Sequence, residues 1–174
     1  LAFERLPQAL VGLSVEVSYQ PLLFAGLLKH WGNLGPAEIE PKRAWTYRQV
    51  AWLAHRQRVR LDLPAEHPFN PLSMLRLALA CAPEAGEGAR LVTPSRRICE
   101  LLFHHVWHGG ADANDPLRLS ALAAALQPVR DPQGEAVRRA LREATNSAAE
   151  RGIFGVPTIE VDERRFWGLD SIDM

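Results

Sequence analysis

Few of the features that mark specialised protein classes occur in this 174-residue sequence. Its two cysteines, Cys81 and Cys99, form neither a C-x-x-C pair nor a metal-ligand spacing, which argues against a disulfide framework or a zinc site. No apolar run approaches the ~18 residues of a membrane span, so we expect no membrane partner. Basic and acidic residues cancel at 20 each, and we expect no basic stripe and no nucleic-acid partner.

The composition that remains is that of an ordinary globular protein. Apolar residues make up 47% of the chain and aromatic residues 7%, which suits one folded domain, or a small domain with a large insertion. The two cysteines are expected to be buried in helices as small apolar residues. Free buried thiols fit a reducing compartment, and we expect a cytoplasmic protein.

Apolar periodicity and turn residues predict mainly helices. One helix is expected over 1–10, a strand over 15–19, and five helices between 42 and 151, with a loop over 83–94. PTIEVDERRFW is predicted to form a hairpin that turns at Asp162–Glu163, and a last helix is expected to begin near Leu169. Because the chain begins inside one expected helix and stops as another begins, we expect residues to be missing at both ends.

This order of elements predicts an α/β fold. One strand precedes the helical run and two follow it, which suits a thioredoxin-like sheet of three strands with a large all-helical insertion. A further strand ahead of Leu1, the first of that fold, is expected to be missing from the chain. The predicted domains are a discontinuous thioredoxin-like domain, 1–41 and 152–174, and a helical insertion domain, 42–151.

Gly-Val-Pro ahead of a strand is the most specific short motif. In a thioredoxin fold the Val156–Pro157 bond would be cis, a rare and positional feature. The alternative is a trans proline that begins an edge strand. The cis form leaves the main-chain N–H and C=O of Val156 open to an extended ligand, which could pair with them as an added strand does.

Longer motifs carry a family resemblance. GIFGVPT (152–158) and FWGLD (166–170) are joined, in order, by segments upstream: PLLFAGLLKHWGNLGPAEIEPKRAW, HPFNPLSMLRLALA and VWHGGADANDP. Together these segments resemble the family of 2-hydroxychromene-2-carboxylate isomerases and kappa-class glutathione transferases, which have a DsbA-like thioredoxin fold. The resemblance runs from Leu1 to Met174. It implies glutathione as the cofactor and a homodimer as the assembly.

The resemblance also implies glutathione-binding residues. Val156 and Pro157 would hold the cysteinyl group, and Asp170 would receive the γ-glutamyl ammonium. Asn33 and Lys42 would contact the glycine end. Each polar residue has a simpler alternative: a helix cap for Asp170, a turn residue for Asn33 and a solvated charge for Lys42.

Two features of the family pattern are not found in the sequence. Leu169 stands where a polar residue is usual, which puts one side-chain hydrogen bond to glutathione in doubt. The catalytic serine of the family would lie before Leu1, so no catalytic residue is assigned within the sequence.

A small aromatic substrate is expected to bind against the insertion. The candidates are Asn70, Trp107 and Trp167, with helix capping and core packing as the alternatives. His104, His105 and His108 suggest a metal site, but no nearby carboxylate or cysteine completes a ligand set, so we expect no metal.

The resemblance implies a glutathione-dependent isomerase of the 2-hydroxychromene-2-carboxylate type, in which the thiolate adds to the substrate, a bond rotates and glutathione leaves. Three alternatives stay open. They are a glutathione transferase acting on another electrophile, a DsbA-like thiol–disulfide oxidoreductase with a cysteine before Leu1, and a binding module without enzymatic activity.

Overall fold

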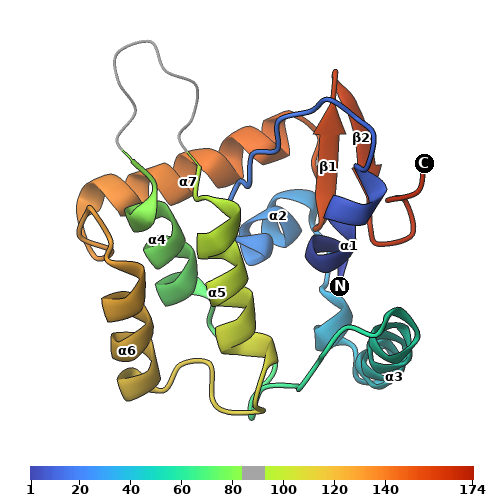
Figure 1. Ribbon diagram of the computed structural model, residues 1–174, viewed down its shortest axis with the longest axis horizontal. Coiled ribbons are helices and arrows are strands. Elements are labelled where there is room, and N and C mark those ends of the chain that lie inside the picture. The colour runs from blue at the N-terminus through green and yellow to red at the C-terminus, as the bar shows by residue number, and fades with distance from the viewer. Residues whose placement is uncertain (84–92) are drawn as a thin grey trace. The chain divides into compact units, whose positions relative to one another are not determined.

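A computed structural model describes residues 1–83 and 93–174 of the chain. The described residues form seven α-helices, one short 3-10 helix (η1) and one two-stranded sheet (Figure 1). In chain order the elements are α1 (Ala2–Ala9), α2 (Phe24–Trp31), η1 (Pro36–Glu38), α3 (Glu40–Gln57), α4 (Leu72–Cys81), α5 (Arg96–Trp107), α6 (Pro116–Leu126), α7 (Glu135–Glu150), β1 (Thr158–Val161) and β2 (Arg164–Trp167). No helix in the described part of the chain is both long enough and apolar enough to cross a membrane.

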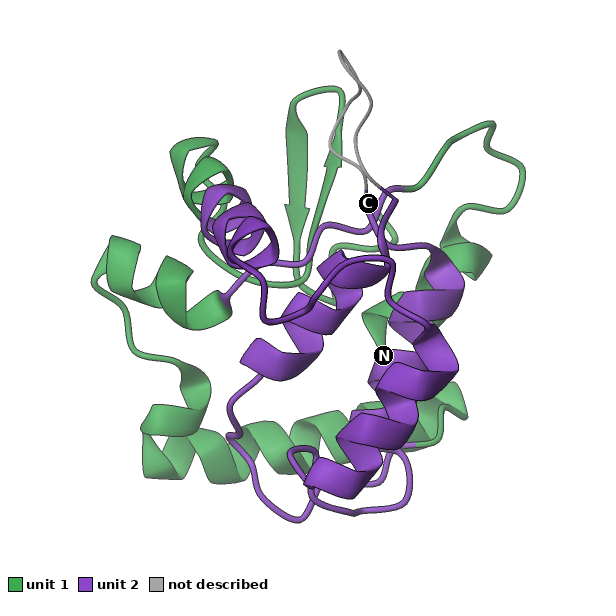
Figure 2. Ribbon diagram, turned by 90° about the vertical axis from the view of Figure 1, so that its left-hand side faces the viewer, with its two compact units in different colours: residues 1–17, 24–60, 146–174 green, residues 18–23, 61–145 purple. Residues whose placement is uncertain are grey.

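The chain divides into two compact units, coloured separately in Figure 2. Unit 1 comprises 1–17, 24–60 and 146–174, and unit 2 comprises 18–23 and 61–145. Helix α7 belongs to unit 2 up to Thr145 and to unit 1 from Asn146. These boundaries differ from those predicted, since α3 lies in unit 1; the insertion over 42–151 stays a prediction.

Unit 2 has a helical core. Helix α5 packs against α4 and α6, as Figure 1 also shows. The buried residues of this core come from these helices and the turn before α6: Met74, Leu77, Ala78, Cys81, Leu102, Val106, Ala113 and Leu122. A second cluster joins α4 to α7 through Leu79, Ala80, Val137 and Leu141.

Local capping fixes the start of two of these helices. The Ser95 hydroxyl accepts a hydrogen bond from the N–H of Ile98 at 3.4 Å, which caps α5. The Asp115 carboxylate accepts one from the N–H of Arg118 at 2.8 Å, ahead of Pro116 at the first position of α6. Both caps satisfy amide groups that a helix leaves unpaired at its N-terminus.

The predicted hairpin is confirmed in unit 1. Strand β1 pairs with β2 in antiparallel register, from Thr158 opposite Trp167 to Val161 opposite Arg164. Asp162 and Glu163 form the two-residue turn, with φ of 46° and 68°. A turn with positive φ at both positions matches the twist of the strands that it joins.

Three other predictions about secondary structure turn out differently. The segment 15–19 is not a strand, because no described strand pairs with it, and the described sheet has two strands where three were expected. Residues 170–173 form a turn and not a helix: the amide of Ile172 bonds Leu169 and that of Met174 bonds Ser171, three residues back in each case. The apolar stretch that follows Pro21, for which no helix was predicted, contains α2. Most of the loop predicted over 83–94 lies outside the described residues.

Candidate functional site

The segment between α7 and β1 holds the most distinctive backbone of unit 1. The Val156–Pro157 peptide bond is cis, as predicted. The Val156 side chain is 43% exposed, and its main chain has no hydrogen-bond partner among residues 1–83 and 93–174. Val156 can therefore offer a free N–H and a free C=O to a ligand in extended conformation.

Asp170 lies beside this open backbone. The N–H of Gly168 donates to the carbonyl of Pro157 at 2.9 Å, which ties the end of β2 to the residue after Val156. A Cβ at Gly168, which has a φ of +91°, would overlap the Asp170 carboxylate, so the carboxylate lies directly against that glycine. Asp170 is exposed, and its carboxylate has no hydrogen-bond or ion-pair partner in the described part of the chain. It is available to a cation.

Trp167 contacts the same segment. Its indole ring lies so close to Gly155 that a side chain at residue 155 would overlap the indole nitrogen. The ring also contacts Phe154, with 4.9 Å between the ring centroids, and Trp167 remains 53% exposed. The hairpin thus gathers Val156, Pro157, Trp167 and Asp170 into one exposed cluster, the hairpin site.

Asn33 belongs to the same unit. It follows the end of α2, where its N–H donates to the carbonyl of Leu28 at 2.9 Å, and its side chain is exposed. The neighbouring Trp31 donates from Nε1 to the carbonyl of Ile153 at 2.9 Å. This bond fixes the end of α2 to the segment that leads into the hairpin site.

Lys42 lies in the first turn of α3 and is exposed. No contact with the hairpin site is present among the described residues, so the structure leaves its predicted role in glutathione binding open.

Two predicted substrate residues lie in unit 2 and have structural roles there. The Asn70 side chain accepts a hydrogen bond from the N–H of Leu72 at 3.1 Å, at the start of α4. Trp107 packs against the core of unit 2 and against the His67 ring, 5.6 Å away between ring centroids. These are the capping and packing alternatives; a role toward substrate stays a prediction for both.

The histidines at the C-terminal end of α5 and just after it have non-metal partners. The His104 and His108 rings stack, with 4.1 Å between centroids. The Nε2 of His105 lies 2.9 Å from the carbonyl of Ala113. Among the described residues no group of three His, Cys, Asp or Glu side chains could hold a metal ion.

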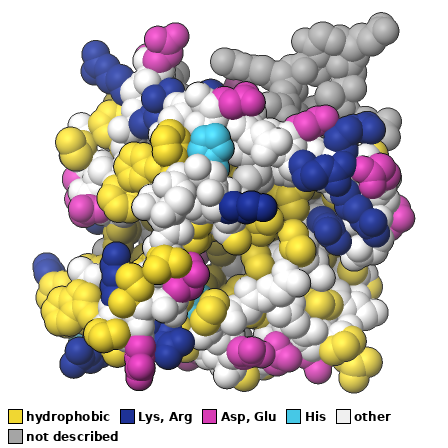
Figure 3. Space-filling view, turned by 180° about the vertical axis from the view of Figure 1, so that it is seen from behind, with side chains coloured by type: hydrophobic (Ala, Val, Ile, Leu, Met, Phe, Trp, Pro, Cys, Tyr) yellow, Lys and Arg dark blue, Asp and Glu magenta, His cyan; other side chains and the backbone are white. Residues whose placement is uncertain are grey.

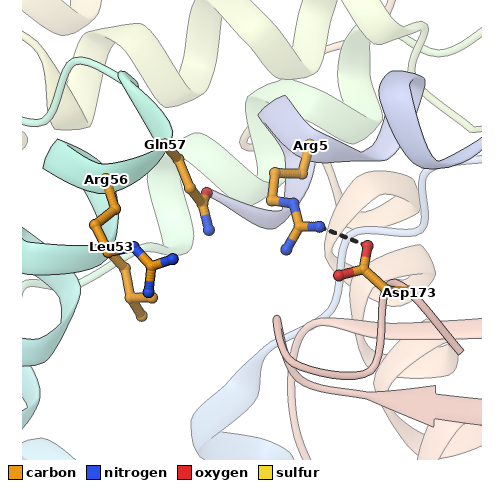
Figure 4. A pocket seen from close by; sticks show the side chains of 5 residues that line it. All are labelled: Arg5, Leu53, Arg56, Gln57 and Asp173. Carbon is orange, nitrogen blue, oxygen red and sulfur yellow. Dashed lines mark hydrogen bonds and ion pairs between the residues drawn. The ribbon is translucent and has the colours of Figure 1, made fainter.

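A pocket of about 440 Å³ in unit 1 was not predicted (Figure 4). Leu53, Arg56 and Gln57 of α3 line one side, and the ion pair of Arg5 with Asp173 lies on the other. No local pattern reveals this pair, since 168 residues separate its members. The pocket contains none of the residues predicted to bind glutathione.

Comparisons with known proteins identify the family of the chain. The DSBA-like thioredoxin domain family matches residues 1–174. The chain is 27% identical to 2-hydroxychromene-2-carboxylate isomerase of Sphingobium xenophagum, over 99% of the chain and 87% of that protein. It is 25% identical to glutathione S-transferase kappa 1 of Rattus norvegicus, over 92% of the chain and 76% of that protein.

A solved structure supports the fold. A structure of 2-hydroxychromene-2-carboxylate isomerase superposes with a TM-score of 0.76 at 21% identity, covering 97% of this chain and 82% of that one. A likeness at this identity concerns the fold alone. The chain therefore has a DsbA-like thioredoxin fold, mostly helical and with a small sheet, as predicted.

Proposed function

We propose that this chain, which belongs to the family of DsbA-like thioredoxin domains, binds glutathione at the hairpin site and uses its thiol to isomerise a small aromatic substrate. One observation carries the proposal. The unpaired main chain of Val156 and the unpaired carboxylate of Asp170 lie at one place, joined by the 2.9 Å hydrogen bond from Gly168 to Pro157. A peptide with a free ammonium group complements both.

Glutathione has groups that match these partners. Its cysteinyl N–H and C=O can pair with the main chain of Val156 as an added strand would. Its γ-glutamyl ammonium can donate charge-assisted hydrogen bonds to Asp170. Asn33 and Lys42 would meet the glycine carboxylate. Trp167 offers an exposed aromatic face to the substrate beside the thiol.

The proposed reaction needs no reactant other than glutathione and the substrate, and it regenerates glutathione. The thiolate adds to a conjugated C=C bond of the substrate, so a C–S bond forms and the double bond becomes single. Rotation about that single bond follows, after which the C–S bond breaks, the double bond returns and the thiolate is released. The protein lowers the thiol pKa and orients both partners. The resemblance implies that a serine before Leu1 stabilises the thiolate.

A second activity would use the same site. The rat relative is named a glutathione S-transferase. In a transferase reaction the C–S bond would persist in the product. The redox alternative receives no support from this chain's own cysteines, because Cys81 and Cys99 are both buried and unpaired.

The Asp170→Asn variant tests the binding step. Losing one charge-assisted hydrogen bond is expected to weaken glutathione binding about 10- to 100-fold in calorimetry. S-methylglutathione should bind the unaltered chain as well, because the thiol is not used in docking. The matched control is Asp162→Asn, an exposed aspartate in the hairpin turn, which should leave the affinity unchanged. Equal affinities for Asp170→Asn and the control would contradict the proposal.

Turnover needs its own assay, on the full gene product. An isomerase returns glutathione unchanged and yields a product of the same mass as the substrate. A transferase yields a product heavier by glutathione. Mass spectrometry with 2-hydroxychromene-2-carboxylate separates the two, and an unaltered substrate in the presence of bound glutathione would exclude the isomerase activity while leaving glutathione binding intact.

A further inference from the structure

Helix α3 and the residues just after it concentrate positive charge. Residues 40–60 contain six of the chain's 20 basic residues and only one of its 20 acidic residues, a net charge of +5 in a chain whose formal charge is zero. The balance over the whole chain hides this excess, so the expectation that no basic stripe exists is wrong for this segment.

Two tryptophans lie on the outer face of α3. Trp45 is 59% exposed and Trp52 is 53% exposed, and seven residues, or about two turns, separate them. The guanidinium of Arg48 lies 5.7 Å from the Trp45 ring and that of Arg56 lies 4.8 Å from the Trp52 ring. Viewed from behind, hydrophobic and basic side chains adjoin at the lower left, where a half turn from Figure 1 places α3 (Figure 3).

The charges on this face are not neutralised. Neither Arg48 nor Arg56 has a carboxylate partner within residues 1–83 and 93–174. The inner side of α3 contributes Ala54 to the protein interior, with Val50 and Leu53 half-buried. The helix therefore rests on the protein by a small apolar side and presents Trp45, Arg48 and Trp52 outward. Arg56, which also lines the pocket of Figure 4, lies at the edge of the same face.

The charge of this face selects an anionic partner. A second copy docking through the same face would bring like charges together, which disfavours association. Single-stranded nucleic acid is held by a basic groove with stacked bases, whereas α3 is convex and its two tryptophans lie about 10 Å apart along the axis. Tryptophan is enriched at the headgroup level of a bilayer, and clustered basic residues are attracted to anionic lipid headgroups.

We propose that the outer face of α3, formed by Trp45, Arg48, Trp52 and Arg56, docks on a bilayer surface that contains anionic phospholipids. The indole rings enter the headgroup level, where their apolar body and polar N–H are both satisfied. The guanidinium groups pair with lipid phosphates while their stems lie along the rings. The attachment is peripheral and reversible and needs no membrane-spanning helix, of which the described residues contain none. It departs from the expectation of no membrane partner.

Co-sedimentation with vesicles tests this docking. The full chain is mixed with vesicles of phosphatidylcholine, with or without phosphatidylglycerol, at low and at physiological ionic strength. We expect binding only to the anionic vesicles, weakened by salt. The R48E/R56E variant should lower the partition coefficient at least about tenfold, since each basic residue near an anionic surface contributes roughly fivefold. W45S/W52S should also bind more weakly.

The matched control is R97E/R139E, which changes the net charge equally at exposed arginines of α5 and α7. Its vesicle binding should stay within about threefold of the unaltered chain, and circular dichroism verifies that every variant is folded. Equal loss in both double variants, or equal binding to neutral vesicles, would overturn the proposal. Self-association abolished by R48E/R56E would show instead a second copy on this face, and displacement from vesicles by an oligonucleotide at lower concentration would show a nucleic-acid site; either result overturns it.

Discussion

Cys99 lies on α5, 8% exposed, and burial raises the pKa of its thiol to about 11 from an ordinary value of 9.0. Only the thiolate reacts with alkylating reagents, so a rise of this size lowers the reactive fraction at neutral pH roughly 100-fold. We expect Cys99 to resist iodoacetamide at pH 7 in the folded protein. Mass spectrometry of the labelled peptide, native against urea-unfolded, measures the difference.

Cys81 provides the internal comparison, because burial raises the pKa of its thiol as well. Both thiols should respond in the same direction. Labelling speeds up as the pH rises toward the raised pKa. It also speeds up on unfolding, because unfolding returns the pKa to its ordinary value. Native labelling of Cys99 at the rate of a free thiol would show that its side chain is open to solvent.

At the residue scale, a contact can be read from the sequence where the partner is close in the chain. Ser95 and Asp115 cap helices through amides three residues ahead, and such spacing can be read directly. The buried cysteines followed from their apolar neighbours in periodic helices. Arg130 could not be found this way, because its guanidinium bonds the carbonyls of Leu79 and Ala82 at the end of α4, about 50 residues earlier.

At the scale of elements, Thr145 connects α7 to the segment before α2. Its hydroxyl donates to the carbonyl of Leu141 at 2.8 Å and accepts from the N–H of Leu23 at 3.0 Å, and the residue is 7% exposed. Thr145→Val keeps the shape but leaves the amide of Leu23 without its acceptor. We expect the free energy of unfolding to fall by about 1–3 kcal/mol, measured by urea denaturation.

Two further variants isolate the hydroxyl group. Thr145→Ser retains the donor and acceptor and loses only a methyl group, so it should be closer to the unaltered protein than the valine variant. Asn146→Ala, at the exposed neighbouring position, should change stability by less than about 0.5 kcal/mol. A valine variant as stable as the serine variant would mean that Leu23 finds another acceptor.

Secondary-structure elements could be predicted where the sequence signal is local. The prediction failed where an element needs a pairing partner elsewhere in the chain. The hairpin follows from alternation in PTIEV and from a turn at Asp162 that permits positive φ. Alternation over Val15, Val17 and Tyr19 resembles a strand equally well, but a strand exists only when another pairs with it, and none does among the described residues. Alternation alone therefore cannot decide strand formation.

The hairpin site illustrates the same limit. Val156, Pro157 and Asp170 were predicted from a motif that is nearly contiguous, and the structure brings them together. Asn70 and Trp107 belong to unit 2, where capping and core contacts already account for them. Motif resemblance identifies residues close in the chain more securely than a pocket built from distant segments.

At the scale of the whole molecule, the basic and acidic residues are equal in number but unevenly distributed along the chain. The formal net charge is zero and the sequence pI is about 7.2, yet residues 40–60 carry +5 and the rest of the chain carries the compensating negative charge. Screening acts over about 10 Å at 0.1 M salt, so at that ionic strength a surface interacts mainly with the protein charges nearest to it. Net charge and pI therefore do not predict whether this protein binds a charged surface.

Ion-exchange chromatography at pH 7 tests this asymmetry directly. We expect the unaltered chain to be retained by a cation exchanger at low salt, although its formal net charge is zero, because α3 presents Arg48 and Arg56 to the resin. R48E/R56E should flow through, whereas R97E/R139E, with the same change of four charges, should still be retained and elute at lower salt than the unaltered chain. If the two variants elute together, net charge governs the behaviour and the basic face of α3 does not act as a unit. If they elute separately, the position of the changed charges affects retention at equal net charge. The basic face of α3 then binds an anionic surface even when no lipid is present.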